Sequence, residues 1–359
     1  SDLAETREGT GTRLEEGAVG GDSMSNAEGI EEMQRKPSLG SANFPTMDDG
    51  RTFHLQTRIG EIANRMITVG SHKRAELFST FLDDPVRFES NRGFTVYTGT
   101  YKGVPVSIVA IGMGHPMMDM YLREAMWCCE GDFAIIRFGT CGAIRKEIRP
   151  GHICIAEDSI LVTQNPDAWA EDHLPPPTSA GSSSGIGLSA DSLPSSDEDI
   201  PAQKAAGKDY LVSKPARPDR GITELLVSNM KSVFGEERVH LGGNITSDSY
   251  FSTQGRQSVD FDDRNQLLVE ELRTLYPSGA IMEMETFHLF HLARTCFRQL
   301  KVAAAAQVLA QRNSDEMITP TEIALVESQA CGPLLDALVA TPLLNVMDDE
   351  RCIWNQRKK

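Results

Sequence analysis

Residues 133–142 have the sequence FAIIRFGTCG, and this stretch decides the fold. The run 133–138 is apolar apart from Arg137, which is the pattern of a strand buried on both faces in the middle of a sheet. Similar apolar runs precede and follow it, with helically spaced segments between them. Strands that alternate with helices predict an α/β protein. We therefore expect three layers, α/β/α, around a central mixed, largely parallel sheet.

The boundaries of the other elements follow from apolar periodicity and from glycine and proline positions. The expected strands are 66–69, the hairpin arms 94–101 and 104–111, 152–156, 239–245, 279–284 and 301–308. The expected helices are 71–82, 116–129, 222–233, 264–276, 286–297 and 320–338.

Two stretches are too poor in large apolar residues to join a core. Residues 1–50 are rich in Gly, Ser, Glu and Asp, and we expect a disordered N-terminal extension. Residues from about 171 to 203 contain a proline triplet followed by Ser, Gly and acidic residues, and we expect a flexible insertion. The rest, 51–359, is expected to form a single domain.

Composition excludes several classes of protein. The chain has 359 residues, 40% of them hydrophobic, which supports a real core, and a net charge of −16, which disfavours binding to nucleic acid or anionic membranes. No signal peptide is expected, and no apolar run approaches the roughly 20 residues that span a bilayer. Seven cysteines without a C-x-x-C pair indicate reduced thiols in a cytoplasmic protein. No metal site is expected, since no His, Cys and Asp cluster has ligand spacing.

Two strand ends carry arginine beside glycine, a combination that suits an anion. Gly70 ends the first expected strand and Arg74 lies in the first turn of the following helix, where a bound anion would use both the cation and the helix dipole. A surface ion pair is the alternative for Arg74 alone. Arg137 is followed by Thr140 between two glycines, which predicts a tight turn whose N–H groups and hydroxyl cradle an anion. The alternative is a buried arginine–carboxylate pair beside an ordinary turn.

Two later strand ends carry groups that suit a base and a sugar. Gln254 and Arg256 can bind the donor–acceptor edge of a planar heterocycle while Tyr250 covers its face. Glu283 and Glu285 point the same way along an extended chain, which suits vicinal hydroxyls, although Glu285 could also be a simple helix N-terminal acid. An anion site, a base reader and a carboxylate pair together indicate a nucleoside and phosphate.

Nucleophilic chemistry has weaker support in the sequence. Cys141 lies between glycines, but no histidine stands in a recognisable partner motif, and a small residue there needs no chemical explanation.

The same motifs give the chain a resemblance to the nucleoside phosphorylase-I family, from Phe53 to about Pro320. IRFGTCGAI at 136–144 is similar to the family's R-x-G-T-x-G core, and EME at 283–285 is similar to its ribose clamp. TVGSHKR at 68–74 is similar to its phosphate loop. The Gln-x-Arg pair at 254–256 is most similar to that of the uridine phosphorylases.

The resemblance implies a role for each matching residue. Phosphate would be held by Gly70, Arg74, Arg92, Arg137 and Thr140. Uracil would be held by Tyr250, Gln254, Arg256 and Arg312, and ribose by His54, Thr140, Glu283, Met284 and Glu285. The groups implied to act in catalysis are Arg137, Thr140, Glu285 and Arg256. Segments 91–95 and 53–55 resemble those that reach a neighbouring subunit, so in a homodimer Arg92 would act in trans on phosphate and His54 would act in trans on the ribose 5′-hydroxyl.

The implied activity is the reversible phosphorolysis of uridine, 2′-deoxyuridine or thymidine to the base and a pentose 1-phosphate, in pyrimidine salvage. The partners are then the nucleoside and inorganic phosphate as co-substrate, with no organic cofactor. An interface cation lacks support, because Gly93 stands where bacterial relatives carry the glutamate that binds it.

Three alternatives stay open. A purine nucleoside phosphorylase would use Asp315 of the Ser314-Asp315 pair on the base. A hydrolytic nucleosidase would need no phosphate arginines. A non-catalytic nucleoside-binding relative would be expected to lack Arg74, Arg137 or Glu285, and all three are present.

Overall fold

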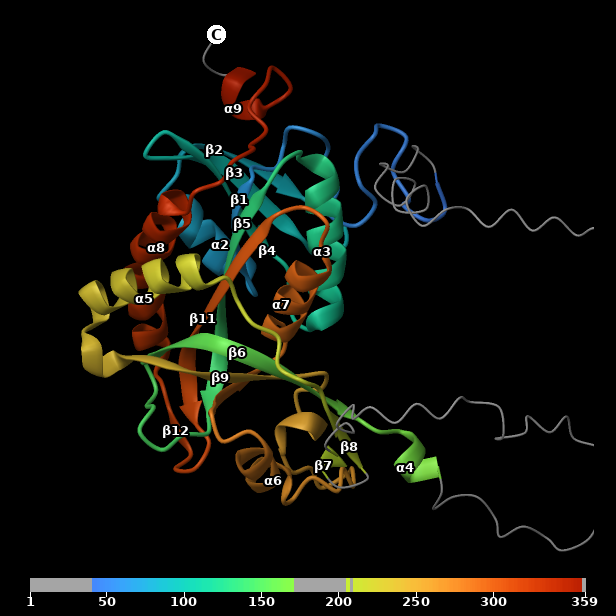
Figure 1. Cartoon of the computed structure of the whole chain (residues 1–359), viewed down its shortest axis with the longest axis vertical. Coiled ribbons are helices and arrows are strands. Elements are labelled where there is room, and N and C mark those ends of the chain that lie inside the picture. Colours follow the sequence, from blue (N-terminus) through green and yellow to red (C-terminus); the bar gives the residue numbers. More distant parts are fainter. Residues whose placement is uncertain (1–40, 171–204, 207–208, 357–359) are drawn as a thin grey trace, which may run out of the picture. The chain divides into compact units, whose positions relative to one another are not determined.

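The computed structural model describes residues 41–170, 205–206 and 209–356 (Figure 1). The expected insertion at 171–203 and most of the expected extension at 1–50 lie outside the described residues. Residues 41–50, which we assigned to the extension, form a bridge from Thr46 to Thr52, and Phe44 stacks on Trp127 with ring centroids 5.7 Å apart. The boundary drawn at residue 50 is therefore too far along the chain.

Strands and helices alternate through most of the described chain. The strands are β1 (Arg65–Val69), β2 (Asp83–Glu89), β3 (Thr95–Tyr101), β4 (Val104–Ala110), β5 (Phe133–Ala143), β6 (Ile153–Gln164), β7 (Ala205–Ala206), β8 (Tyr210–Val212), β9 (Val239–Ser247), β10 (Gly279–Glu283), β11 (Leu300–Gln311) and β12 (Glu316–Met317). The helices are α2 (His72–Ser79), α3 (His115–Cys128), α4 (Asp167–Ala170), α5 (Arg220–Phe234), α6 (Leu268–Leu275), α7 (Thr286–Thr295), α8 (Pro320–Ala340) and α9 (Ile353–Gln356).

The strands form one mixed sheet in the order β12-β11-β6-β9-β10-β5-β1-β4-β3-β2. Its parallel pairs are β4–β1, β1–β5, β5–β11, β6–β9 and β9–β10, and its other pairs are antiparallel. A mixed sheet is therefore confirmed, and its parallel pairs are centred on β5 and on β9. Because β5 also pairs with β11 and β10, the strands β5, β11, β6, β9 and β10 close into a ring.

Helices cover both faces of the sheet, which gives the expected three layers (Figure 1). On one face α3 and α7 pack on alternate residues of the central strands, such as Ile135 and Val302. On the other face α2, α5 and α8 pack on the intervening residues, such as Ile136 and Ala303. Since Arg137 is two residues from Ile135 on strand β5, it shares the α3 and α7 face of the sheet.

Strand β5 is longer than the sequence predicted. The segment 139–142, which we expected to form a tight turn, continues the strand through Ala143. Gly139–Cys141 pair with β11, and Gly142 and Ala143 pair with both β11 and β10. The ladders on either side keep this glycine-rich segment extended, so it offers strand backbone and side chains instead of a turn.

Helix α8 corrects our expectation about membrane-length segments. In the described part of the chain, it is the one helix that is long and apolar enough to cross a membrane by length and composition. Its residues Val326, Ala330, Leu334 and Leu338 are buried in the core beside β1 and β5. Its apolar character is thus accounted for by packing inside the fold.

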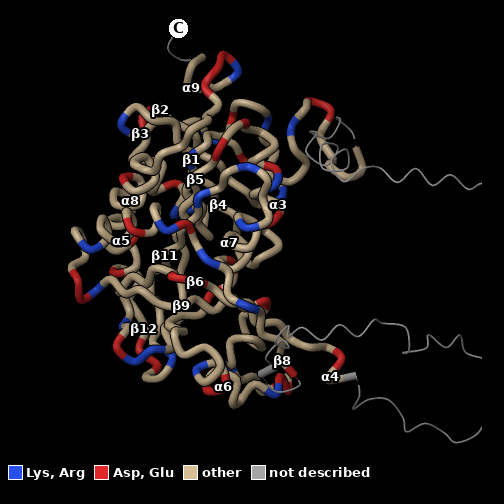
Figure 2. Tube along the Cα trace, in the orientation of Figure 1, with Lys and Arg blue, Asp and Glu red and all other residues tan. Residues whose placement is uncertain are grey.

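Basic and acidic residues are interspersed along the described trace (Figure 2). This mixed pattern accompanies the net charge of −16 of the whole chain.

Candidate active site

A cavity of about 280 Å³ lies where the ends of β1, β4, β5, β9, β10 and β11 meet. Many of the residues quoted above line this cavity. Among them are Gly70, Arg74, Arg137, Gly139, Thr140, Tyr250, Gln254, Arg256, Glu283, Met284, Glu285, Arg312 and Asp315. Residues more than 200 positions apart in the sequence thus face one space.

Arg74 lies in the first turn of helix α2, whose N-terminus is capped by the Ser71 hydroxyl. Its side chain is buried, with Nε 2.7 Å from Oε1 of Glu327 and Nη1 3.3 Å from the carbonyl oxygen of Phe138. Burial lowers the pKa of Arg74, and Glu327 opposes that shift. Arg74 does have an acidic partner, as the ion-pair alternative expected. The pair is buried, however, and Glu327 holds the guanidinium at the wall of the cavity.

Arg137 is the central cation of the site. It is 3% exposed, and its guanidinium bonds Glu283, with Nε 3.3 Å from Oε2, and Glu285 through Nη2. Its third nitrogen, Nη1, is buried without a hydrogen-bond partner among the described residues. A buried donor without an acceptor is costly, so this nitrogen is a binding position for an incoming anion.

Glu283 has a different role from the one we expected. Its oxygens accept hydrogen bonds from Asn244 at 2.8 Å, from Thr246 at 2.5 Å, from the backbone N–H groups of Glu285 and Thr286, and from Arg137. Burial would raise the pKa of Glu283, but Arg137 and these donors hold the pKa below its ordinary value. Each oxygen of Glu283 meets three donors, so the side chain orients Arg137 and the start of α7 and has no lone pair left for a ribose hydroxyl.

Glu285 faces the cavity as a ligand group. It stands at the N-cap of α7 but makes no side-chain capping bond, which argues against a simple helix N-terminal acid. Oε1 instead accepts the Gly114 N–H at 2.6 Å, and Oε2 pairs with Arg137. Burial raises the pKa of Glu285, Arg137 opposes the shift, and the nearby Glu283 adds to it. With Met284 beside it, Glu285 is the group on this strand end suited to sugar hydroxyls.

Two glycines of the R-x-G-T-x-G segment make room for the arginines. A Cβ on Gly139 would lie 2.9 Å from Nη2 of Arg137. A Cβ on Gly142 would lie 3.2 Å from Cδ and Cγ of Arg312. The glycines therefore serve the packing of two guanidinium side chains against extended backbone.

In the same cavity, three polar residues form one hydrogen-bonded group. Nη2 of Arg256 lies 3.3 Å from Oε1 of Gln254, and Nη2 of Arg312 lies 3.0 Å from the Gln254 carbonyl oxygen. Arg312 also keeps a buried, unpartnered Nη1 in the described structure, and burial followed by repulsion from Arg256 lowers its pKa. Arg256 lies over the Tyr250 ring, 4.1 Å from its centroid, so Tyr250 positions Arg256 in addition to its expected role beside a base.

Several cavity residues escaped sequence reasoning. Gly112 and Met113 follow strand β4, and this glycine-flanked strand end was a usable signal. Leu309, Ala310 and Met317 form an apolar wall that no motif marks. Glu327, the partner of Arg74, lies in the middle of α8 and carries no local signal at all.

His54 and Arg92 do not line the cavity of their own chain. They lie together, because Arg92 stacks on Phe53 with Cζ 5.2 Å from the ring centroid and Ser90 donates to the His54 carbonyl oxygen. The expectation that both act in trans is compatible with this shared position outside the cavity.

Cys141 lines the cavity but is poorly suited to nucleophilic chemistry. Its thiol is buried, and burial raises its pKa well above the ordinary value, with Cys154 and Glu283 adding to the effect. A protonated thiol is a weak nucleophile, so the small Cys141 side chain is better explained by packing than by catalysis.

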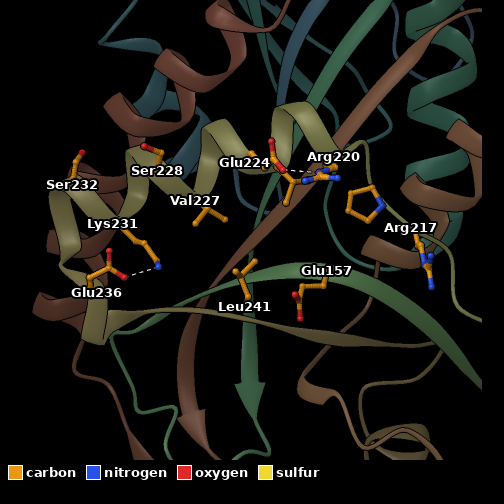
Figure 3. A pocket seen from close by; sticks show the side chains of 12 residues that line it. Glu157, Arg217, Arg220, Glu224, Val227, Ser228, Lys231, Ser232, Glu236 and Leu241 are labelled. Carbon is orange, nitrogen blue, oxygen red and sulfur yellow. Dashed lines mark hydrogen bonds and ion pairs between the residues drawn. The ribbon is translucent and has the colours of Figure 1, made fainter.

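A larger hollow, of about 830 Å³, lies on the outside of the fold between α5 and strands β6 and β9 (Figure 3). Val227 faces Leu241 across it, and two of its cations are already paired on the surface. Arg220 bonds Glu224 at 2.6 Å and Lys231 bonds Glu236 at 2.5 Å. The smaller cavity, with its buried arginines and carboxylates, is therefore the site with chemistry.

Two curated proteins are similar to this chain in sequence. A uridine phosphorylase of Thermococcus kodakarensis is 25% identical over 295 residues, covering 81% of this chain and 89% of its own length. A DeoD-type purine nucleoside phosphorylase of Oceanobacillus iheyensis is 36% identical over 112 residues, covering 31% of this chain and 47% of its own length.

Two solved structures of nucleoside phosphorylases are also similar to this chain. A structure from work on uridine phosphorylases of Phytophthora capsici is 37% identical, with a TM-score of 0.71, and the match covers 84% of this chain and 98% of that one. A nucleoside phosphorylase of Trypanosoma brucei is 21% identical with a TM-score of 0.63, over 83% of this chain and 100% of that one, which shows the fold alone. The family model described as the Phosphorylase superfamily matches residues 64–339, and the chain accordingly belongs to that superfamily.

Proposed function

We propose that this protein is a uridine phosphorylase, a pentosyltransferase that moves ribose reversibly between uracil and inorganic phosphate. The observation that carries the proposal is that one cavity is lined both by Arg74 and Arg137 and by the Gln254, Arg256 and Arg312 group. Glu285 and Met284 line the same cavity. The cavity therefore holds groups suited to an anion, a sugar and a base, which are the three parts of the reacting pair.

The reaction breaks the bond between C1′ and N1 of the base and forms a bond between C1′ and a phosphate oxygen. Positive charge develops on the sugar and negative charge on uracil, so catalysis requires stabilisation of both and placement of the nucleophile. Arg74 and Arg137 would hold phosphate, and the unpartnered Nη1 of Arg137 offers one donor for it. Arg256 and Gln254 would bind the uracil carbonyls on which the negative charge grows.

Phosphate serves as co-substrate in this scheme, and no organic cofactor is needed for it. Proton transfer to the base has no dedicated acid in the scheme, because the leaving uracil anion is delocalised and bound by Arg256. The negative net charge of the chain does not oppose an anionic substrate, since local arginines set the potential inside the cavity.

A purine nucleoside phosphorylase is the second candidate. Two observations favour it: the local identity to DeoD-type enzymes, and the presence of Asp315 in the cavity lining. Gln254 and Arg256 line the same cavity and form a hydrogen-bonded pair, which favours a pyrimidine edge.

The test is the ultraviolet change of uridine with and without phosphate, with inosine in parallel. We expect uridine to be cleaved only when phosphate is present, and faster than inosine. Cleavage without phosphate would indicate a hydrolase, and a preference for inosine would indicate the purine enzyme. No reaction with either nucleoside would leave only a binding protein.

We also propose a homodimer in which His54 and Arg92 complete the pocket of the partner subunit. Their shared position, outside the cavity lining of their own chain, supports this arrangement. The turn that carries Arg92 has Gly93 at φ +87°, a conformation that favours glycine over the glutamate of bacterial relatives.

Subunit mixing tests this arrangement. Arg92→Ala and Glu285→Ala chains should each be nearly inactive, but a mixed dimer has one intact pocket if Arg92 acts in trans. Random pairing makes half of the dimers mixed, so a 1:1 mixture should recover about a quarter of wild-type activity. Arg137→Ala mixed with Glu285→Ala is the control and should recover nothing, because both residues belong to the same pocket wall. A mixture no more active than its separate chains contradicts donation of Arg92 in trans.

We further propose that the enzyme works in the cytoplasm. All seven cysteines lie in the described part of the chain, none of them forms a disulfide there, and six are buried, which suits a reducing compartment.

A further inference from the structure

Glu124 is a buried carboxylate. Its four hydrogen bonds all go to one short segment, His54 and Leu55. It lies in helix α3 and is 5% exposed. The His54 N–H lies 3.1 and 3.0 Å from its two oxygens, and the Leu55 N–H lies 2.6 Å from Oε2. Oε1 also lies 2.6 Å from Nδ1 of the His54 ring.

This set of contacts fixes the ring of His54 as well as its backbone. The two backbone N–H groups hold the position of residue 54, and the contact at Nδ1 sets the rotation of the imidazole. The ring remains about one-third exposed, so its other edge is accessible from outside.

The contact also decides which ring nitrogen carries the proton. An ionised carboxylate only accepts hydrogen bonds, so the nitrogen that faces it must donate. In the neutral ring, Nδ1 is then protonated, and Nε2 is an acceptor on the accessible edge.

We infer that Glu124 is a positioning residue for recognition of the ribose 5′-hydroxyl. It holds His54 so that Nε2 accepts the hydrogen bond of that hydroxyl in the pocket of the partner subunit. The inference rests on the proposed function and on the proposed dimer.

The ion pair of Glu124 shows whether the residue orients the His54 ring or only fastens the loop backbone. Its one ion-pair partner in the described structure is the ring of His54. The comparable buried Glu61, which contacts residues on both sides of the His54 segment, pairs with Arg51 and Arg58 instead. A carboxylate that only fastened the loop would gain more from such an arginine than from an imidazole.

The test compares uridine with 5′-deoxyuridine, which lacks the hydroxyl in question. The measured quantity is the ratio of kcat/KM for the two substrates, in the wild type, His54→Ala, Glu124→Ala and the double variant. The wild type should prefer uridine, and each single variant should lower the ratio by about tenfold, the worth of one hydrogen bond. The double variant should lower the ratio no further than His54→Ala alone.

The possible outcomes distinguish a failure of the role of Glu124 from a failure of the proposed function or of the role of His54. If the wild type does not cleave uridine, the proposed function fails, and if His54→Ala keeps the wild-type ratio, the role of His54 fails. If His54→Ala loses the preference while Glu124→Ala slows both substrates equally, Glu124 is only an anchor and the inference is wrong. Asp119→Ala removes an exposed acid on the same helix, paired with Arg123, and should leave the ratio unchanged.

A second variant covers the case in which Glu124→Ala does not fold. Glu124→Gln keeps an oxygen for the backbone N–H groups but offers the ring an N–H in place of an acceptor. Spectra of the enzyme with ¹⁵N-labelled histidine should then show His54 changing from the Nδ1–H to the Nε2–H tautomer. An unchanged tautomer would overturn the inference.

Discussion

Replacement of Arg137 by alanine is expected to lower kcat/KM for uridine phosphorolysis by about 10³-fold or more. The Arg137 guanidinium bonds Glu285 through one nitrogen and, among the described residues, keeps another buried nitrogen without a partner, which is available to an anion. Its loss removes a phosphate contact and a charge that balances the developing transition state. Steady-state kinetics with phosphate as the varied substrate should show a large rise in KM together with a fall in kcat.

The same change should also destabilise the protein, which the experiment must separate from catalysis. Glu283 and Glu285 would be left as buried carboxylates without their cation, at a cost of about 3–5 kcal/mol. Arg137→Lys keeps a positive charge and should fold better, yet it cannot serve both carboxylates and phosphate as a planar guanidinium does. Cys141→Ala changes a buried residue of the same cavity and should retain activity. A folded Arg137→Lys enzyme with nearly full activity would contradict the assignment, and an inactive Cys141→Ala enzyme would reopen covalent chemistry.

Arg256→Ala is expected to lower kcat/KM for uridine by about 10²-fold, through loss of stabilisation of the departing base. Because that stabilisation matters most when the leaving anion is basic, the loss should be smaller for 5-fluorouridine, whose base is a better leaving group. Comparison of the two substrates in the variant and the wild type measures this difference.

The control for Arg256 is Arg220→Ala, which removes an exposed arginine paired with Glu224 on the outer surface of α5. It should leave both substrates unaffected. An equal loss for uridine and 5-fluorouridine in Arg256→Ala would mean that Arg256 acts on binding of the ground state and not on the leaving group.

Sequence reasoning located the cavity because its residues follow strand ends, where a short motif carries local information. Gly70, Arg74, Arg137, Thr140, Gln254, Arg256, Glu285 and Arg312 all line it, as expected. The same reasoning misjudged residues 139–142, because a Gly-x-x-Gly segment has the composition of a turn whether or not ladders flank it. Only the two neighbouring strands, β11 and β10, decide that it stays extended.

Roles that depend on distant partners could not be predicted. Glu283 was assigned to ribose from its spacing to Glu285, but the hydrogen bonds from Asn244 and Thr246 come from another strand. Strand β2 escaped notice because it begins with two aspartates and Pro85, and its apolar alternation is limited to Val86 and Phe88.

Helix α3 connects Glu285, at one end, with the His54 segment, near the other end. The Gly114 N–H, just before its first turn, bonds Glu285, while Glu124, near its other end, grips the segment of His54. In the proposed dimer these are pockets of different subunits, so a shift of α3 on filling one pocket would move the histidine that serves the other. The two halves of the enzyme would then sense each other's occupancy, and binding of the second nucleoside would differ in affinity from binding of the first.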